Sequence, residues 1–144
     1  MKKDKLTTGI FHASYLMGAL LILVETLRRG FAYWGVHATT IIEDYISGAF
    51  LIIAAVLWIK KSPRARMVMA GAWAYMIGMM TPTFFSHFEA YLRGATRILD
   101  QPYDDVGAII MRGLLWLAAV IGLGLTLYSA DSNSADSNKK TGDN

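Results

Sequence analysis

Four ionisable side chains lie within or at the edges of strongly apolar segments: Glu25, Glu43, His87 and Arg112. Such groups are costly in lipid, so each is expected to face a protein interior or water and to find a partner there. At a rise of about 1.5 Å per helical residue, all four fall at a similar depth near one end of their segments. Two carboxylates, an imidazole and a guanidinium at one depth predict a polar pocket for a ligand or a partner protein.

Each glutamate also has a purely structural interpretation. Glu25 precedes Arg28 and Arg29 by three and four residues, which is the spacing of ion pairs on a helix surface. Glu43 follows Thr40 by three residues, which is the spacing of a capping box at the start of a helix. The sequence leaves these alternatives open beside the pocket hypothesis.

His87 and Arg112 carry the same ambiguity. A histidine among aromatic side chains near a membrane interface is typical of a belt residue with one satisfied hydrogen bond. His87 has three such neighbours: Phe84, Phe85 and Phe88. Arg112 either snorkels to the interface or pairs with an internal acid, for which Glu43 is the first candidate and Glu25 the second. Asp44 is interpreted as a solvated charge favoured by the start of a helix.

The sequence does not favour a metal or haem site. It contains no cysteine, which excludes disulfides, thiolate chemistry and iron–sulfur clusters. On a helix His87 and Glu89 point apart. Haem between two helices would need His12 and His87 at one depth, but they lie near opposite ends. The methionines of the segment 65–93 suit copper(I) as soft ligands, yet methionine also serves as flexible packing. We therefore expect no metal.

The elements that must position these residues are four apolar blocks separated by charged segments. Of 144 residues, 54% are hydrophobic and 17% charged, which is too apolar for an ordinary soluble domain. The blocks predict helices at about 8–29, 41–60, 65–93 and 105–129, each near the roughly 20 residues that cross a bilayer. We therefore predict an all-α integral membrane four-helix bundle over residues 1–129. The polar segment 130–144 is expected to be a disordered cytoplasmic tail.

Lysine and arginine set the expected orientation. Most of the 14 basic residues fall on the side of the two termini: Lys2, Lys3, Lys5, Lys60, Lys61, Arg64, Arg66, Lys139 and Lys140. The remainder fall on the other side: Arg28, Arg29, Arg93, Arg97 and Arg112. Because cytoplasmic loops are enriched in basic residues, both termini are predicted to lie in the cytoplasm of an inner-membrane protein. The basic residues thus indicate topology, and nucleic acid is not an expected partner.

Individual residues of the third segment mark a break, a stop and a contact face. Pro82 predicts a kink, and Thr81 and Thr83 lie near the carbonyls that lose their donor. Gly94 is the expected stop of the helix. Small residues recur every four positions and predict packing seams between helices: Ala70, Ala74 and Gly78 here, and Ala118 and Gly122 on the fourth segment.

Residues 41–127 resemble the DoxX-like group of small four-helix membrane proteins. The features that carry the resemblance are, in order, Glu43 opening a helix, Ser47-Gly48-Ala49, the basic link Lys60 to Arg64, the aromatic-flanked His87 and Arg112-Gly113-Leu114-Leu115. The resemblance implies a four-helix membrane subunit, sometimes tied to quinone-linked redox or oxidative-stress complexes. It maps Glu43, His87 and Arg112 onto the polar positions of the group and does not establish catalysis.

The function expected from these observations is that of a small membrane subunit, not catalytic on its own, with an outward-facing polar pocket. The pocket would hold a quinone-like or amphipathic ligand or a partner protein, and the expected partners are the lipid bilayer and other membrane proteins or further copies of the chain. The alternative is a small dimeric solute or drug transporter that uses a membrane carboxylate, Glu25, for coupling. A redox enzyme is disfavoured by the missing cysteine and the weak histidine pattern.

Overall fold

The computed structural model describes the backbone of residues 2–29, 38–94, 97–98, 101–102 and 106–141, and side chains within 8–24, 26–27, 42–94 and 106–129. In chain order its elements are α1 (Lys2–Arg29), α2 (Ala38–Ile59), α3 (Ala65–Leu92), β1 (Arg97–Ile98), β2 (Gln101–Pro102) and α4 (Val106–Thr141). The two short strands pair antiparallel, with Arg97 opposite Pro102 and Ile98 opposite Gln101. The predicted all-α architecture of four helices is confirmed for the described part of the chain.

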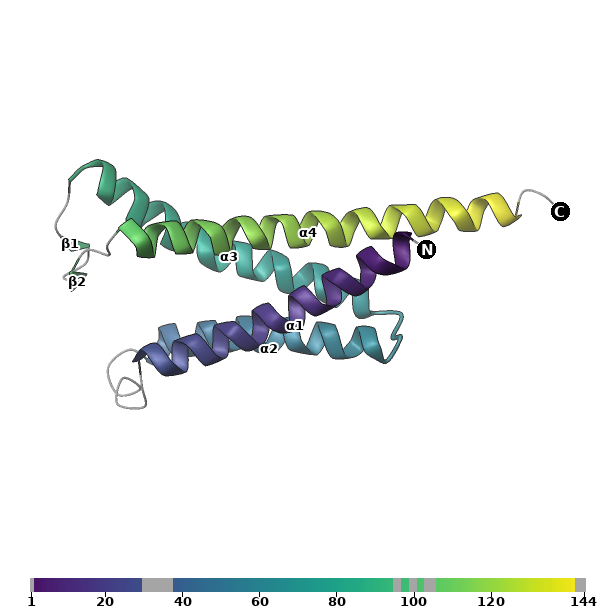
Figure 1. Cartoon of the computed structure of the whole chain (residues 1–144), viewed down its shortest axis with the longest axis horizontal. Helices are drawn as coiled ribbons and strands as arrows, with labels where there is room; N and C mark the ends of the chain where they lie inside the picture. The colour runs from purple at the N-terminus through teal and green to yellow at the C-terminus, as the bar shows by residue number, and fades with distance from the viewer. Residues whose placement is uncertain (1, 30–37, 95–96, 99–100, 103–105, 142–144) are drawn as a thin grey trace.

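The helices form two hairpins joined by a short turn. α1 packs mainly on α2 and α3 mainly on α4, while α2 and α3 connect the hairpins and α1 has the weakest contact with α4. In Figure 1 the hairpins separate toward the end where α1 and α3 finish and where α2 and α4 begin. The α2–α3 turn, residues 60–64, lies at the opposite end. We call that end the turn end, and the end where the hairpins separate the open end.

The turn end contains the core. Small and flexible side chains from α2, α3 and α4 are fully or almost fully buried there: Leu51, Ala54, Ala55, Met69, Ala72, Trp73, Met76 and Ala119. Trp73 is the bulkiest of them, and it fits because α4 presents Gly122. A Cβ added at Gly122 would lie 2.6 Å from Cε2 of Trp73, which no real Cβ can do. The alanines and this glycine let α3 approach α2 on one side and α4 on the other.

A second close approach joins α1 to α2 at Gly18 and Gly48. A Cβ at Gly18 would lie 2.6 Å from the carbonyl oxygen of Gly48, and a Cβ at Gly48 would lie 2.7 Å from that of Gly18. The two backbones are therefore in direct contact, and any larger residue must push the helices apart. Ser14 and Ser47 are buried near this crossing, and each bonds a carbonyl of its own helix, those of Ile10 and Glu43. Their polar groups therefore need no partner on the other helix.

The packing seam expected on the third helix is wrong for the single chain. Ala74 and Gly78 are exposed, Ala70 is half-buried, and a Cβ at Gly78 would meet nothing within 4 Å. The buried face of α3 carries Met69, Ala72, Trp73 and Met76 in its place. The buried face of α3 is therefore a different face from the one that carries the stripe of small residues.

Two predicted helix starts differ from the structure. α1 begins at Lys2, earlier than the expected residue 8. α2 begins at Ala38, so Thr40 lies inside the helix and the predicted capping box with Glu43 is wrong. Asp104 and Asp105, the expected caps of the fourth helix, lie outside the described residues.

The helix ends are also informative. α3 ends at Leu92, and Gly94 follows with a φ of +65°, a conformation that favours glycine, so the predicted stop is confirmed. α4 continues to Thr141, through most of the segment 130–144 for which the sequence predicts disorder. The side chains of residues 130–141 lie outside the described part of the chain.

Pro82 lies inside α3, and the neighbouring threonines bond to the helix backbone. The Thr81 hydroxyl donates to the carbonyl of Ile77 at 2.7 Å, and that of Thr83 donates to the carbonyl of Met79 at 3.3 Å. Proline cannot donate to the carbonyl four residues earlier, which is that of Gly78. The threonines therefore bond the carbonyls on either side of Gly78 and not the one that loses its donor.

The outer surface is rich in large apolar side chains. Leu16, Ile53, Ile110 and Leu117 are among those exposed, one or more on each of α1, α2 and α4, and α3 exposes Phe85 and Leu92. Two helices are long and apolar enough to cross a membrane, over Ile42–Ile59 and Val106–Ser129, and α1 has a shorter apolar stretch at Thr8–Val24. Only 28% and 11% of the two long windows are buried, whereas the core helix of a soluble protein would be mostly buried. This is weak evidence for membrane association, based on length and composition.

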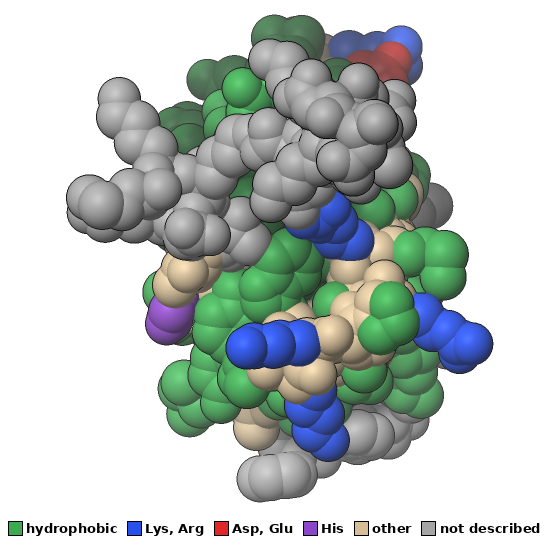
Figure 2. Space-filling view, turned by 90° about the vertical axis from the view of Figure 1, so that its right-hand side faces the viewer, with side chains coloured by type: hydrophobic (Ala, Val, Ile, Leu, Met, Phe, Trp, Pro, Cys, Tyr) green, Lys and Arg blue, Asp and Glu red, His purple; other side chains and the backbone are tan. Residues whose placement is uncertain are grey.

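Basic side chains gather at the turn end. Figure 2 looks onto this end and shows lysine and arginine side chains around it; the turn itself contributes Lys60, Lys61, Arg64 and Arg66. The guanidinium of Arg66 lies over the ring of Trp58, 5.7 Å from its centroid. Acidic residues are absent from 59–66, so the charged side chains of the turn are all basic.

Candidate functional site: a pocket between the hairpins

A pocket of about 550 Å³ lies between the two hairpins, on the side of the bundle away from the turn. All four helices contribute to its lining, through the second half of α1, the first turns of α2, the region around Pro82 in α3 and the first turns of α4. Its size falls within the range of roughly 300–1,000 Å³ that holds a small organic ligand. The pocket therefore lies where the two hairpins separate.

The walls of the pocket are mostly aliphatic side chains and methionines. α1 contributes Met17, Leu20, Leu21 and Val24, α3 contributes Met79 and Met80, and α4 contributes Met111 and Leu115. Methionine is unbranched and polarizable, so a wall of this kind adapts to ligands of different outline. The walls favour an apolar body without dictating its shape.

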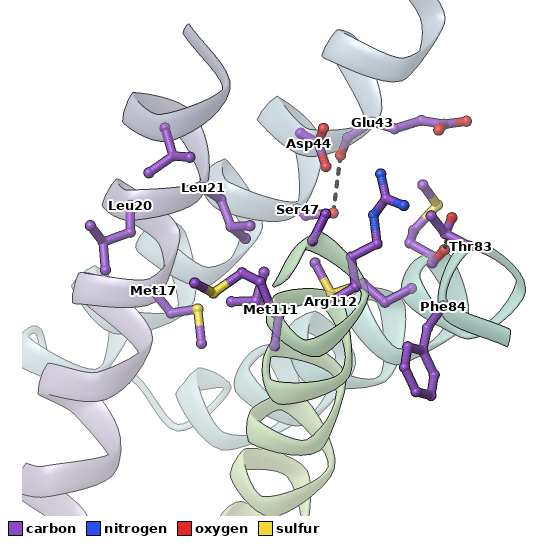
Figure 3. Close-up of a pocket in the computed structure, with 15 residues that line it drawn as sticks. Met17, Leu20, Leu21, Glu43, Asp44, Ser47, Thr83, Phe84, Met111 and Arg112 are labelled. Atoms are coloured by element: carbon purple, nitrogen blue, oxygen red, sulfur yellow. Dashed lines mark hydrogen bonds between the residues drawn. The ribbon is translucent and has the colours of Figure 1, made fainter. Parts of the chain in front are cut away.

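Polar groups gather at one part of the pocket. Glu43, Asp44 and Ser47 come from α2, Arg112 from α4 and Thr83 from α3. Figure 3 shows the Arg112 side chain reaching from α4 toward the first turns of α2, where Glu43, Asp44 and Ser47 lie. Glu43 is exposed, Asp44 and Arg112 are half-buried, and Ser47 is buried with its hydroxyl 3.0 Å from the carbonyl of Glu43. A charged part and an apolar part within one cavity suit an amphipathic molecule.

The structure brings together two of the four residues that the sequence singles out. Glu43 and Arg112 line the same pocket, from helices far apart in the chain. His87 does not line it, although it lies within electrostatic range of Arg112. The side chain of Glu25 lies outside the described residues. Whether any of these residues acts in a function stays a prediction.

Asp44 and Thr83 also line the pocket, although the sequence does not indicate either as a site residue. Asp44 was interpreted as a solvated edge charge, but it is half-buried and lies one turn from the buried Ser47 on the same face of α2. That spacing of three residues was a signal available in the sequence. Thr83 was considered only for the backbone near Pro82, and no pattern in the sequence indicated that it faces a cavity.

Aromatic contacts hold the α3 side of the pocket against α4. The ring of Phe84, a lining residue, stacks on that of Trp116 with centroids 6.1 Å apart and on that of Phe88 at 5.9 Å. The Trp116 indole N–H donates to the Thr81 hydroxyl at 3.0 Å. Gly113 makes room for Phe84, because a Cβ there would lie 2.9 Å from the ring. The aromatic cluster expected around His87 thus has a defined role, which is to fix one pocket wall.

The α1–α2 side is fixed in a different way. The hydroxyls of Thr26 and Tyr45 lie 2.5 Å apart and join the two helices across the hairpin. The Gly18–Gly48 contact holds the backbones together next to the lining residues of α1, since Gly18 directly follows Met17. Each hairpin is therefore internally braced, and the pocket lies where the two braced units meet.

The site offers no metal centre within the described side chains. No three histidine, aspartate or glutamate side chains in that part of the chain converge closely enough to hold an ion. The carboxylates of the pocket come from adjacent residues of one helix, with a guanidinium as the facing charge. The arrangement suits hydrogen bonding and charge recognition of a ligand.

Comparison of the chain with protein-family models, with curated proteins and with solved structures finds no match, so the resemblance to the DoxX-like group stays a prediction.

Proposed function

We propose that this chain is a multi-pass inner-membrane protein that binds an amphipathic ligand between its two hairpins, as a subunit that is not catalytic on its own. Both termini and the basic turn would lie in the cytoplasm, and the open end with its pocket would face outward. The ligand class suggested by the DoxX-like resemblance is a quinone, held by its polar head at Arg112 and by its tail along the methionine walls. Each part of this proposal has separate support.

The membrane setting is supported by the outer surface and by its charges. Large apolar residues cover the outside of the helices, and water would make such a surface costly. The turn between α2 and α3 carries four basic residues, as cytoplasmic turns typically do. A four-span arrangement uses α1 and α3 as additional spans beside the two helices that qualify by length and composition.

The observation that carries the binding function is the composition of the pocket. α1, α3 and α4 contribute the apolar lining, while the charged residues Glu43, Asp44 and Arg112 come from the starts of α2 and α4. An amphipathic ligand would bury its apolar part along the walls and satisfy its head at those charges. A partner protein would need a convex side chain or helix end of the same character.

The alternative of a small dimeric transporter draws support from the same carboxylates. A membrane carboxylate that faces a cavity can exchange a proton for a substrate, and Asp44 and Glu43 occupy such a position. Glu25 was the expected coupling residue, and its side chain lies outside the described part. Transport of ligand across sealed vesicles would favour this alternative over a binding subunit.

The test is to identify what the purified protein retains. The protein is extracted from membranes, washed in neutral detergent, and its bound small molecules are identified by mass spectrometry. Met111→Trp places a bulky ring in the pocket, and Leu114→Trp is the matched control, since both residues lie on α4 with 59% and 57% exposure but only Met111 lines the pocket. We expect an amphipathic molecule that Leu114→Trp retains and Met111→Trp loses. Equal retention by both variants would contradict binding in the pocket.

A further inference from the structure

We propose that the turn end binds the phosphate group of an anionic phospholipid through the lysine and arginine side chains of the α2–α3 turn. This site lies at the opposite end of the bundle from the pocket, so it is separate from the site of the proposed function. The inference rests on that function only for the membrane setting. It follows from the backbone of the turn, from its charges and from the apolar side chains beside them.

The backbone of the turn places Lys61 where glycine is the usual residue. The Lys61 N–H donates to the carbonyl of Trp58 at 2.9 Å, and the Ser62 N–H donates to the carbonyl of Leu57 at 3.0 Å. These two bonds form a Schellman motif at the end of α2, and Lys61 is the residue of the motif that adopts the left-handed conformation. Its φ is +52°, and among the described residues other than glycine it alone has a positive φ. A residue with a Cβ is strained in this conformation, whereas glycine is not.

The strain at Lys61 is not offset by contacts within the described part of the chain. The side chain is exposed, and it makes no hydrogen bond or ion pair with another described residue. Residues held in unfavourable backbone conformations often mark functional sites. Compared with glycine at the same position, Lys61 adds a long side chain that ends in a positive charge. We therefore attribute its presence to that charge.

Three further basic side chains surround Lys61. Lys60 and Arg64 are exposed, and neither has an acidic partner among the described residues. Arg66 is half-buried and reaches from the start of α3 to the end of α2, where its guanidinium lies 5.7 Å from the centroid of the Trp58 ring. Cations held close together attract an anion more strongly than any one of them alone. Lysine and arginine are also the residues that bind phosphate groups most strongly.

The backbone of the turn is already hydrogen-bonded, so side chains must supply the contacts to an anion. The N–H groups of Lys60 and Ala65 donate to backbone carbonyls, and that of Arg64 donates to the Ser62 hydroxyl. Pro63 has no N–H. With the two bonds of the Schellman motif, every N–H of the turn has an acceptor inside the protein. Binding therefore depends on ammonium and guanidinium groups, which substitutions can remove one at a time.

Apolar side chains beside the cations favour a lipid over a soluble anion. Ile59 at the end of α2 and Met67 at the start of α3 are both exposed, and each directly neighbours a basic residue of the cluster. Figure 2 shows the basic side chains of this end among hydrophobic ones. A soluble phosphate would leave these apolar groups in water, whereas a phospholipid carries acyl chains next to its phosphate. Basic clusters at the edge of a membrane segment are typical sites for anionic lipid headgroups.

The experiment measures which lipid the purified full-length protein retains. The protein is equilibrated with micelles of a neutral detergent that contain equal amounts of phosphatidylglycerol and phosphatidylcholine with identical acyl chains. Native mass spectrometry then gives the ratio of the two bound lipids for wild type, Lys61→Gly and Lys61→Arg. Arg93→Gln is the matched control, because it also removes one positive charge from an exposed residue but lies outside the turn. Met111→Trp obstructs the pocket and leaves the turn intact, so it shows at which end the lipid is bound.

We expect wild type, Lys61→Arg and Arg93→Gln to retain phosphatidylglycerol over phosphatidylcholine by about tenfold or more. Lys61→Gly should lower this ratio about fivefold, the effect of one basic side chain near a charged headgroup. The melting temperature of Lys61→Gly should rise by about 3 °C, because glycine removes the strain at this φ. Weaker lipid binding by a more stable protein separates a role in binding from a role in folding.

Several results would overturn the site. They are a wild-type ratio near one, a ratio that Lys61→Gly leaves unchanged, and a Lys61→Gly variant that melts at a lower temperature than wild type. A preference lost in Met111→Trp but kept in Lys61→Gly would place the anionic lipid in the pocket, which supports the proposed function and contradicts the turn site. Displacement of the lipid by an equal concentration of glycerophosphoglycerol, the headgroup without acyl chains, would show that the turn binds a soluble phosphate. If wild type retains neither lipid, the membrane setting is wrong as well.

Discussion

The two ends of the bundle differ in how their helices meet. At the turn end, α2, α3 and α4 pack around Trp73 and a group of alanines that are completely buried. At the open end, the same helices and α1 stand around a cavity of about 550 Å³ with charged side chains in its lining. The comparison shows that one end of the bundle supplies close packing and the other end keeps a cavity open.

The residue types explain the difference. Alanines at positions 54, 55, 72 and 119 let backbones approach at the turn end, and Gly122 admits the Trp73 ring. At the open end the helices face one another with longer side chains, such as Met17 and Met111, and with the charged Asp44 and Arg112. A charged side chain requires either a partner or water. Close packing there would bury Asp44 and Arg112 in an apolar contact, so a cavity is the less costly arrangement.

The largest effect is expected from removing the centre of the packed end. Trp73→Ala should lower the free energy of unfolding by about 3–5 kcal/mol, the typical cost of truncating a buried tryptophan. Trp73 is 2% exposed, whereas Trp58 is half-buried beside Arg66, so Trp58→Ala is the control and should cost clearly less. Unfolding of the purified proteins in mixed neutral and anionic detergent measures both. Equal losses for the two variants would show that the turn end is not the stabilising core.

A smaller but more specific effect is expected at the α1–α2 crossing. Gly18→Ala should destabilise by about 1–3 kcal/mol, because the added methyl would overlap the Gly48 carbonyl oxygen and force the helices apart. Gly78→Ala is the matched control, since its Cβ would meet nothing within 4 Å. That variant should be neutral or more stable by up to about 1 kcal/mol, through improved helix propensity. The same detergent unfolding assay applies, and a destabilised Gly78→Ala with an unaffected Gly18→Ala would reverse the assigned contact.

The smallest expected effect concerns the charges of the open end. The sequence predicts that Arg112 pairs with Glu43 first and Glu25 second, and the structure adds Asp44 as a candidate from the same pocket. Double-mutant cycles should give a coupling of about 1 kcal/mol between Arg112→Met and Asp44→Asn, because both side chains are half-buried. The cycle of Arg112→Met with Glu43→Gln should give less than about 0.5 kcal/mol, since Glu43 is exposed. Simple additivity in both cycles would mean that Arg112 has no acid partner on α2.

Much of the architecture could be predicted from the sequence. Four apolar blocks separated by charges indicate four helices, and Gly94 marks an end because only glycine tolerates its positive φ well. Helix starts were less predictable: Thr40 and Glu43 have the spacing of a capping box, yet α2 begins before them. Local spacing cannot decide between a cap and a helix interior when the preceding residues also tolerate helix.

The site was predictable only in part, for a physical reason. Ionisable residues in apolar segments must find water or partners, and this rule led to Glu43 and Arg112, which share the pocket. The same rule does not tell which face of α3 lines the pocket, so it also selected His87, which lies outside the pocket lining. The orientation of α3 depends on Trp73 fitting against Gly122, which is a contact between residues far apart in the sequence. For the same reason the stripe of Ala74 and Gly78 was expected inside and lies outside.

Cysteine accessibility in intact cells tests the central claim most directly, and the absence of native cysteine makes it clean. Single variants Thr83→Cys in the pocket, Leu114→Cys on the apolar outer surface and Ala119→Cys in the core are exposed to a membrane-impermeant maleimide, which needs water and a thiolate to react. We predict rapid labelling of Thr83→Cys from outside the cell, no labelling of Leu114→Cys until the membrane is dissolved, and labelling of Ala119→Cys only after unfolding. Labelling of Leu114→Cys as fast as Thr83→Cys in intact cells would contradict a lipid-facing surface. Labelling of Thr83→Cys only after cell lysis would contradict a pocket that opens outward.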